Sequence, residues 1–472
     1  MKTIKTFFVS FVFLCLGLVP ISAMGQSMPY TFSANTAAKA SEVNENFTYL
    51  LERFGTRKTT VNCYSGESIT TALKNYNHIV ISGVCTENIS LDGETLPHRV
   101  VILEGSSSAS DGITASSSAS PVIDINYHVF VRVKNLTLKG GVIGLKVRRN
   151  GIALISNSII ESNSSHGICA CGTSFMLSKS NTIRNNSLHG ILATDNAEVN
   201  IKSNTISGHS GGSSITITQG AYALINSNTI TGSSGKIAVR ISRGSSATIK
   251  SNTIQSAYIG ISVQDSSHAI LKNNTVNSNS KSGLKVDNNA SVILAEGNTF
   301  SNNSEYGIRV WLAGSLVMWG NSQLTSPTTI SGNTKGPIRI DEGGSALLSN
   351  LTLASPNKGI IIQNANFVKL DNVTITGSGD FGINVWGTNI GLENSTISGS
   401  TNTEIYAKFS TINLEKTAIT GTVGSDEIEL NYGSMLFIGT GTTITGTVKC
   451  DGSVDNNSID NWTNLTLTTS GC

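Results

Sequence analysis

The sequence has few charged residues and, after its N-terminus, no long apolar run. Charged side chains make up 13% of the 472 residues, and glycine is abundant, with 47 copies. No stretch after residue 25 is long and apolar enough to span a bilayer, so we expect no transmembrane segment. With so little charge, the outer surface must consist mainly of hydroxyl and amide groups, which suits contact with carbohydrate or water.

The N-terminus is typical of a secretory signal peptide. Lys2 and Lys5 precede an apolar run from Phe7 to Val19, and small residues follow at Ala23 and Gly25. We expect residues 1–25 to be removed and the mature protein to be secreted, to the periplasm or the extracellular space. The signal contains two of the 32 basic residues and none of the 30 acidic ones, which leaves 30 of each. This balance argues against a nucleic-acid partner.

A short strand motif repeats thirteen times between residues 144 and 431. Each copy has two apolar residues two positions apart, often after a glycine, and copies follow one another at steps of 22 to 24 residues with one step of 30. Period-two alternation predicts strands, and a fixed period of this length predicts a solenoid in which stacked repeats bury one core. The first apolar positions are Leu145, Ile168, Ile191, Ile215, Val239, Ile261, Leu284, Ile308, Ile338, Ile360, Ile383, Ile405 and Ile428.

Each repeat then carries a second strand, a turn asparagine and a third short strand. With three strands per repeat and no helical pattern between them, we predict an all-β parallel β-helix. The asparagines recur in near-register, so we expect an internal ladder of amides. They are Asn135, Asn157, Asn181, Asn204, Asn228, Asn252, Asn274, Asn298, Asn350, Asn372 and Asn394.

The Gly-Ile-x-Val strands, the Asn-Thr-Ile turns and the period resemble the right-handed parallel β-helix repeats of the pectate-lyase-like superfamily, over roughly residues 60 to 450. The resemblance implies the fold but no reaction, because that superfamily includes lyases, hydrolases, epimerases and proteins without known catalysis. The Asp-Pro-His of mannuronan epimerases is absent, as are the polygalacturonase motifs Asn-Thr-Asp and Gly-His-Gly. The calcium-binding aspartates of pectate lyases have no convincing counterpart either.

We expect three parts: the signal, a helical segment over residues 26–57, and the β-helix over 58–472. Ala40, Val43, Phe47, Leu50 and Phe54 form a two-heptad apolar seam on a predicted helix, which either self-associates into a homo-oligomer or folds onto the β-helix. Residues 58–100, with a small helix near Ile69, form an N-terminal cap. Residues 106–120 are predicted to be a loop, and a second insertion is expected near residues 322–335.

Six cysteines remain after signal removal, an even number in an exported chain. We expect disulfides between Cys63 and Cys85 in the cap and between Cys450 and Cys472 at the C-terminal end, residues 450–472. Cys169 and Cys171, near His166 and His189, are soft ligands that could hold copper or zinc. We expect an oxidised or paired state instead, and neither a metal site nor a cofactor.

Outward residues of stacked strands form columns about 4.8 Å apart per coil. From Lys285 to Tyr406, one face combines cations, carboxylates and indoles, a set suited to sugar rings, hydroxyls and uronates. We predict that this face binds polysaccharide, with a preference for acidic polymer, or another surface glycan. The alternative readings of the same face are a solvated ladder of ion pairs and a protein-contact patch. The candidate binding residues are Lys285, Asp287, Arg309, Trp311, Arg339, Asp341, Gln363, Trp386 and Tyr406.

Two function classes other than binding stay open at this stage. Asp287 and Asp341 lie two coils apart, at about 9 to 10 Å, near the upper range for an inverting carboxylate pair. They are the candidate catalytic residues of a polysaccharide lyase, epimerase or glycoside hydrolase. The third class is a structural or adhesive surface rod.

Overall fold

The computed structural model describes residues 57–318, 327–354, 357–421 and 426–450, and the backbone of two further strands near the C-terminus. The signal peptide, the apolar seam from Ala40 to Phe54 and Cys472 lie outside these residues. The homo-oligomer and the division into three parts therefore stay predictions. Residues from Thr59 onward form one compact unit.

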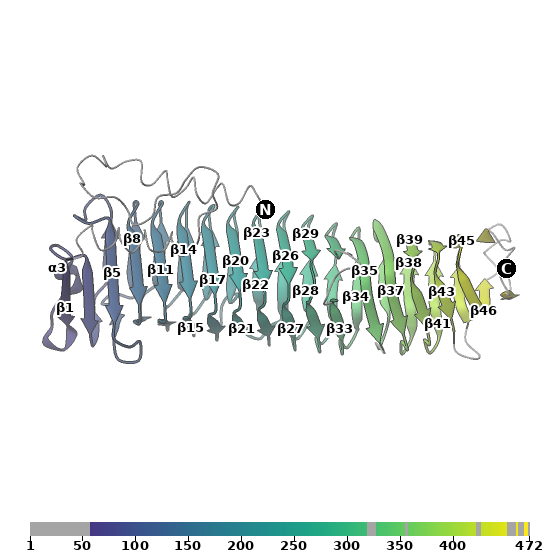
Figure 1. Ribbon diagram of the computed structural model, residues 1–472, viewed down its shortest axis with the longest axis horizontal. Coiled ribbons are helices and arrows are strands. Elements are labelled where there is room, and N and C mark those ends of the chain that lie inside the picture. Colours follow the sequence, from purple (N-terminus) through teal and green to yellow (C-terminus); the bar gives the residue numbers. More distant parts are fainter. Residues whose placement is uncertain are drawn as a thin grey trace, which may run out of the picture. The chain divides into compact units, whose positions relative to one another are not determined.

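This unit is a parallel β-helix in which each coil contributes three strands (Figure 1). Among the described residues, strands pair in parallel with their equivalents one coil away. The first strands of the coils are β4 (Ile89–Asp92), β7 (Ile123–Asn126), β10 (Ile143–Arg148), β13 (His166–Cys171), β16 (Ile191–Thr194), β19 (Ile215–Ile217), β22 (Ile237–Ile241), β25 (Ile259–Val263), β28 (Leu284–Val286), β31 (Tyr306–Val310), β34 (Gly336–Asp341), β36 (Ile360–Gln363), β38 (Phe381–Trp386), β41 (Thr403–Lys408), β44 (Asp426–Asn431) and β48 (Leu467–Ser470).

The second and third strands complete each coil, and in two coils a single long strand serves as both. In a further coil β46 (Thr443–Cys450) continues from the third layer into the first, where Val448 pairs with Ile428 between β44 and β48. The second strands are β2 (His78–Ser82), β5 (Val100–Gly105), β8 (Phe130–Lys134), β11 (Ile152–Ser156), β14 (Phe175–Lys179), β17 (Glu198–Lys202), β20 (Tyr222–Asn226), β23 (Ser246–Lys250), β26 (His268–Lys272), β29 (Ser291–Leu294), β32 (Ser315–Met318), β35 (Ser345–Ala354), β37 (Phe367–Thr376), β39 (Asn389–Glu393), β42 (Thr411–Glu415), β45 (Met435–Ile438) and β47 (Ile459–Asp460). The third strands are β3 (Val84–Thr86), β6 (Gly112–Thr114), β9 (Thr137–Lys139), β12 (Ile159–Glu161), β15 (Thr182–Arg184), β18 (Thr205–Ser207), β21 (Thr229–Thr231), β24 (Thr253–Gln255), β27 (Thr275–Asn277), β30 (Thr299–Ser301), β33 (Thr329–Ser331), β40 (Thr396–Ser398), β43 (Ala418–Thr420) and β46 (Thr443–Cys450), while β35 and β37 continue into this layer.

The predicted register of the first strands is confirmed. Leu145 pairs with Ile168, Ile168 with Ile191, and the series continues to Ile405 and Ile428. These side chains are fully buried in one continuous apolar core. Since the two apolar positions of each strand point inward, the residues beside them must point outward, which fixes the columns on the outer surface.

The asparagine ladder exists, but the predicted set mixed two adjacent positions. The internal ladder is formed by Asn181, Asn204, Asn228, Asn252, Asn274 and Asn298. All six are buried, and each of the first five donates Nδ2–H to Oδ1 of the next at 2.9–3.1 Å. Asn135, Asn157, Asn350, Asn372 and Asn394 come one residue earlier and adopt φ angles of 49–55°. They serve the left-handed turn itself, which asparagine tolerates.

A second buried column follows the third strands and was not predicted. Asn163 donates to Asn186 Oδ1 at 2.9 Å, and Asn279 to Asn303 Oδ1 at the same distance. His209 occupies the same position one coil after Asn186, at 1% exposure. The amides explain the recurrent glycines before the first strands: a Cβ at Gly167 would lie 2.8 Å from Asn186 Nδ2 and 2.7 Å from a carbonyl oxygen.

The N-terminal end agrees with the prediction in most respects. The short helix α3 (Ile69–Ala72) is present, and the Cys63–Cys85 disulfide ties the turn η2 (Cys63–Ser65) to β3. β1 (Lys58–Asn62) pairs with β2. The predicted loop over 106–120 was wrong in part, because β6 crosses it and the buried Asp111 accepts backbone hydrogen bonds from Gly83 and Ser106. β33 likewise interrupts the expected insertion at 322–335.

Candidate binding face

The candidate binding face consists of the outward residues of the first strands from β28 to β41. Lys285 pairs with Arg309, Arg309 with Arg339, and the column continues through Asn384 to Tyr406. In the column two residues further on, Asp341 pairs with Gln363, and Gln363 with Trp386. The register therefore confirms the two columns that were predicted from the repeat period.

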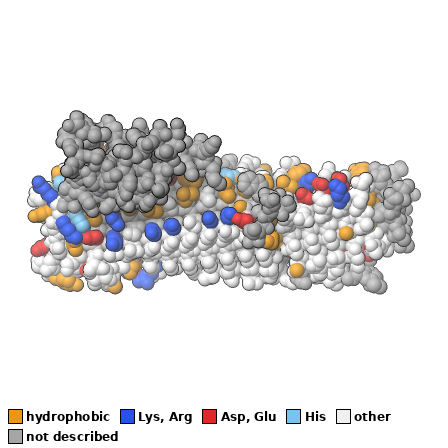
Figure 2. Space-filling view, viewed as in Figure 1, with side chains coloured by type: hydrophobic (Ala, Val, Ile, Leu, Met, Phe, Trp, Pro, Cys, Tyr) orange, Lys and Arg blue, Asp and Glu red, His pale blue; other side chains and the backbone are white. Residues whose placement is uncertain are grey.

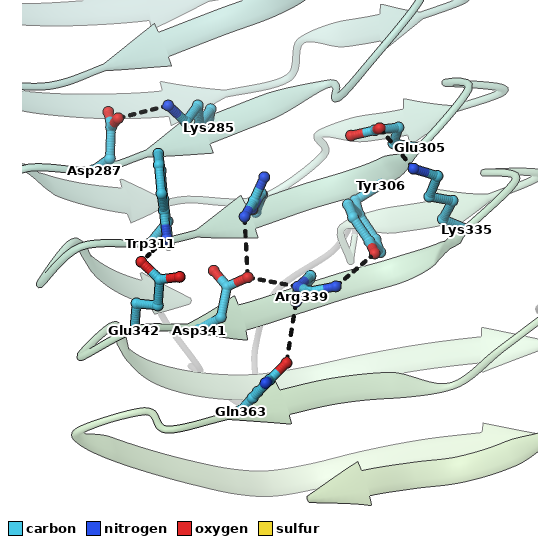
Figure 3. Close-up of polar contacts among 11 residues, drawn as sticks. Lys285, Asp287, Glu305, Tyr306, Trp311, Lys335, Arg339, Asp341, Glu342 and Gln363 are labelled. Carbon is cyan, nitrogen blue, oxygen red and sulfur yellow. Dashed lines mark hydrogen bonds and ion pairs between the residues drawn. The ribbon is translucent and has the colours of Figure 1, made fainter. Parts of the chain in front are cut away.

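The cations of this face are paired with its carboxylates (Figure 3). Lys285 Nζ lies 2.6 Å from Asp287 Oδ2, and Arg339 Nε lies 2.5 Å from Asp341 Oδ2. Arg309 also reaches Asp341 Oδ2, at 3.1 Å. Both aspartates are nearly inaccessible, at 4% and 2% exposure. Two carboxylates pair with three cations here, so the ion pairs offset most, but not all, of the positive charge that an acidic polymer would meet.

Arg339 is the most connected residue of the face (Figure 3). Besides Asp341, its guanidinium donates to Tyr306 Oη at 3.1 Å and to Gln363 Oε1 at 3.2 Å. Burial lowers the pKa of Arg339, but the hydrogen bonds to Tyr306 and Asp341 outweigh burial, and the net pKa is raised. The guanidinium is thus a fixed charge that orders side chains of three successive coils.

Trp311 is half-buried rather than fully open. Lys285 Nζ lies 4.7 Å and the Arg309 guanidinium carbon 4.9 Å from the ring centroid, and the indole N–H donates to Glu342 Oε2 at 2.6 Å. Two cations on this half-buried ring leave less of its surface for a sugar than the single cation beside the exposed Trp386 does. Glu342 and Tyr306 were not predicted from the sequence, although Glu342 directly follows Asp341. Their contacts with Trp311 and Arg339 join different coils, and residue spacing does not reveal such contacts.

An open aromatic cluster lies at the C-terminal end of the face. Trp386 is 43% exposed, and Lys408 Nζ lies 5.1 Å from its ring centroid. Phe409 and Tyr432, which were not predicted, are also exposed and have their centroids 5.3 Å apart. Tyr406 packs against Phe381 with centroids 5.1 Å apart. These rings offer apolar surface next to amides and hydroxyls.

Asp287 and Asp341 are separated by the coil that carries Trp311, and Oδ2 of each is held in an ion pair. The second oxygen, Oδ1, is buried in both residues and has no hydrogen-bond partner among the described residues. In this arrangement each aspartate serves as the counter-ion of a basic side chain. A catalytic role for the pair stays an untested prediction.

Cys169 and Cys171 form a disulfide on β13. The neighbouring rings of His166 and His189 are stacked, with centroids 5.2 Å apart. Burial, and to a lesser extent His189, lowers the pKa of His166 to about 4, so it is neutral at physiological pH. Among the described residues, no group of three or more His, Cys, Asp and Glu side chains is placed to hold a metal ion. Cys450 is also disulfide-bonded, and its predicted partner Cys472 lies outside the described residues.

The sequence matches the family described as "Right handed beta helix region" over residues 73–219 and 171–326. The two matches together span more than half of the chain, so this protein belongs to the right-handed β-helix family. No curated protein matches the sequence. In the described part of the chain, no helix has the length and apolarity needed to cross a membrane.

Several solved structures share the fold at low similarity. The catalytic unit of a GH87 alpha-1,3-glucanase from Streptomyces thermodiastaticus is 16% identical, with a TM-score of 0.32 over 86% of this chain and 69% of that chain. A mutant of the periplasmic alginate epimerase AlgG is 14% identical, with a TM-score of 0.37 over 76% and 98%. The Dettilon tailspike protein is 10% identical, with a TM-score of 0.34 over 89% and 70%. Similarity at this level carries no argument about what the chain does.

Proposed function

We propose that this protein is exported and binds polysaccharide along the candidate binding face, with Trp386 as the main sugar contact. The observation that carries the proposal is the exposure of Trp386, at 43%, in a column that also contains Gln363 and Lys408. An indole face stacks on the apolar side of a sugar ring, while neighbouring amides and hydroxyls bond its hydroxyl groups. The two disulfides among the described residues, Cys63–Cys85 and Cys169–Cys171, fit an oxidising compartment.

The ion pairs of the candidate binding face favour a neutral sugar over an acidic one. Lys285, Arg309 and Arg339 already bond to aspartates, so a uronate would have to compete with a nearly inaccessible aspartate for each of these cations. Neutral, hydroxyl-rich chains avoid this competition. We therefore assign the Trp386 end to a neutral glycan, rather than to the acidic polymer that the sequence favoured.

The test is binding of the full chain to an array of neutral and acidic polysaccharides, comparing wild type with Trp386→Ala. Phe367→Ala is the matched control, because Phe367 is 54% exposed and begins β37 on a different face. We expect Trp386→Ala to weaken binding to a neutral glycan at least tenfold, and Phe367→Ala to change it less than twofold, which corresponds to about 1.4 and 0.4 kcal/mol.

Equal binding by the wild type and Trp386→Ala would refute this assignment, and absence of binding to every glycan would favour a structural or adhesive rod. Reducing ends or unsaturated products are monitored in the same samples. Their release would identify the protein as an enzyme, and Asp287→Asn and Asp341→Asn would then be the variants to examine.

A further inference from the structure

A row of lysines runs along a second face of the β-helix. Register pairings place these side chains at the ends of the second strands, each just before the left-handed turn residue. We call the set the lysine row; it consists of Lys134, Lys179, Lys202, Lys250 and Lys272. A line of basic side chains is visible along the molecule over β8 to β26 (Figure 2).

The row is straight because the coils are in register. Successive pairings connect Lys134 to Ser156, Ser156 to Lys179, and Lys179 to Lys202. The column continues through Asn226 to Lys250 and Lys272. It therefore covers six coil steps, or about 29 Å at ~4.8 Å per step, with neutral residues at the two positions that lack lysine.

Among the described residues, ion pairing of these lysines is confined to the C-terminal end of the row, although Glu104 precedes Lys134 in the same column. Within the described part of the chain, the first four members of the row make no ion pair, and only Lys272 does, with Glu296 at the C-terminal end of the row. Lys179, Lys202 and Lys250 are exposed. Neighbouring positions of the row lie about 5 or 10 Å apart by strand spacing, comparable with the Debye length of ~8 Å in physiological salt, so the fields of the lysines add along the row.

The same column changes sign further along the chain. Beyond residues 319–326, it runs through Ser349 to Asp371, Glu393 and Glu415. The basic and acidic halves explain how a chain with balanced total charge still has a strongly basic region. A polyanion would be attracted by the first half, whereas in the second half the carboxylates of Glu393 and Glu415 lie beside Lys369 and Lys416.

We propose that the lysine row binds a linear acidic polysaccharide whose chain runs parallel to the β-helix axis. A straight, evenly spaced row of point charges suits an extended polymer with one carboxylate or sulfate per repeating unit. Proteins that bind single-stranded nucleic acid usually also provide aromatic side chains on which the bases stack. The positions between the lysines are instead Ser156 and Asn226, whose hydroxyl and amide groups suit a polysaccharide better. This site is independent of the neutral-glycan site at Trp386, which lies on another strand layer.

The experiment measures affinity of the full chain for polygalacturonate, with heparin as a second polyanion and dextran as a neutral polymer, at 50 and 200 mM NaCl. The row variant combines K179Q, K202Q and K250Q. The control variant combines K74Q, K358Q and K416Q, which remove the same charge from exposed lysines elsewhere. All six side chains lie on the surface, so both variants should fold, and circular dichroism checks this.

We expect the row variant to bind polygalacturonate at least tenfold more weakly at 50 mM NaCl, with a salt dependence flatter by about two to three in log–log slope. The control variant should stay within twofold of wild type, and Trp386→Ala should leave polyanion binding unchanged. Equal losses in the two lysine variants, or no binding of either polyanion by wild type, would overturn the proposal. Single-stranded DNA binding as tightly as polygalacturonate at equal salt would replace the polysaccharide with nucleic acid.

Discussion

Replacing His209 by asparagine should stabilise the protein and remove part of its sensitivity to acid. His209 is 1% exposed and occupies the second asparagine column, one coil after Asn186. A Cβ at Gly190 would meet His209 Nε2 at 2.6 Å, just as a Cβ at Gly167 would meet Asn186 Nδ2 at 2.8 Å. The imidazole nitrogen therefore sits where an amide nitrogen sits in the neighbouring coil, and an asparagine fits the same space.

The histidine fills this position without completing the ladder. Neither of its ring nitrogens makes a well-formed hydrogen bond among the described residues. In the coil before, Asn186 Nδ2 donates to Ile160 O at 3.1 Å, and Asn186 Oδ1 accepts two hydrogen bonds from Asn163. The His209→Asn amide can repeat this pattern, and at ~0.5–1.5 kcal/mol per bond we expect a gain of about 1 kcal/mol after the lost packing of the larger ring is subtracted.

The acid effect follows from the pKa. Burial lowers the pKa of His209 from 6.5 to about 4, against a weaker opposing effect of the backbone of Asn186 and Ile183. The unfolded chain takes up a proton below pH 6.5, whereas the folded protein does so only near pH 4. The contribution of the neutral ring is thus fully present above pH 6.5 and is lost as pH falls. Between pH 8 and pH 5 the loss is about 2 kcal/mol.

The assay is urea denaturation of wild type and His209→Asn at pH 8 and pH 5. Other titrating groups act equally in both proteins, so the difference between the two pH dependences isolates His209. We expect the variant to lose about 2 kcal/mol less than wild type on acidification. His128→Asn is the control, because His128 is exposed with φ of 61°, which asparagine tolerates. Identical pH dependences for wild type and His209→Asn would refute the reasoning.

Two further substitutions test the core and a buried carboxylate. Ile308→Asp would place a charge at a fully buried position of the first-strand column, and we expect no folded protein in circular dichroism; an unchanged melting temperature would contradict the register. Glu404 is fully buried, and burial is the main cause of its raised pKa, opposed by hydrogen bonds from Ser400. Its protonated form stabilises the fold at low pH, and this contribution is lost as pH rises through the raised pKa, so Glu404→Gln should melt higher than wild type at pH 8 and close to it at pH 4. A lower melting temperature for Glu404→Gln than for wild type at pH 8 would contradict the claim that the buried, ionised Glu404 destabilises the fold.

The candidate binding face was predictable in its layout but not in its contacts. The column from Lys285 to Tyr406 follows from the repeat period, which can be read directly from the sequence. Whether Trp311 is open or half-buried depends on how far Lys285 and Arg309 reach across neighbouring coils and on the bond to Glu342. Side-chain rotamers decide these contacts, and residue spacing contains no information about them.

The sequence by itself determined the parallel β-helix, the inward positions from Leu145 to Ile428 and the Cys63–Cys85 staple. It could do so because one rule, two apolar residues per short strand at a fixed period, is repeated in every coil, and stacking is the way such repeats bury their apolar sides. The tertiary structure alone decided which of two adjacent turn positions belongs to the ladder. Asn157 and Asn181 look alike in sequence, yet a shift of one residue at the end of a strand turns a side chain from the core to the solvent.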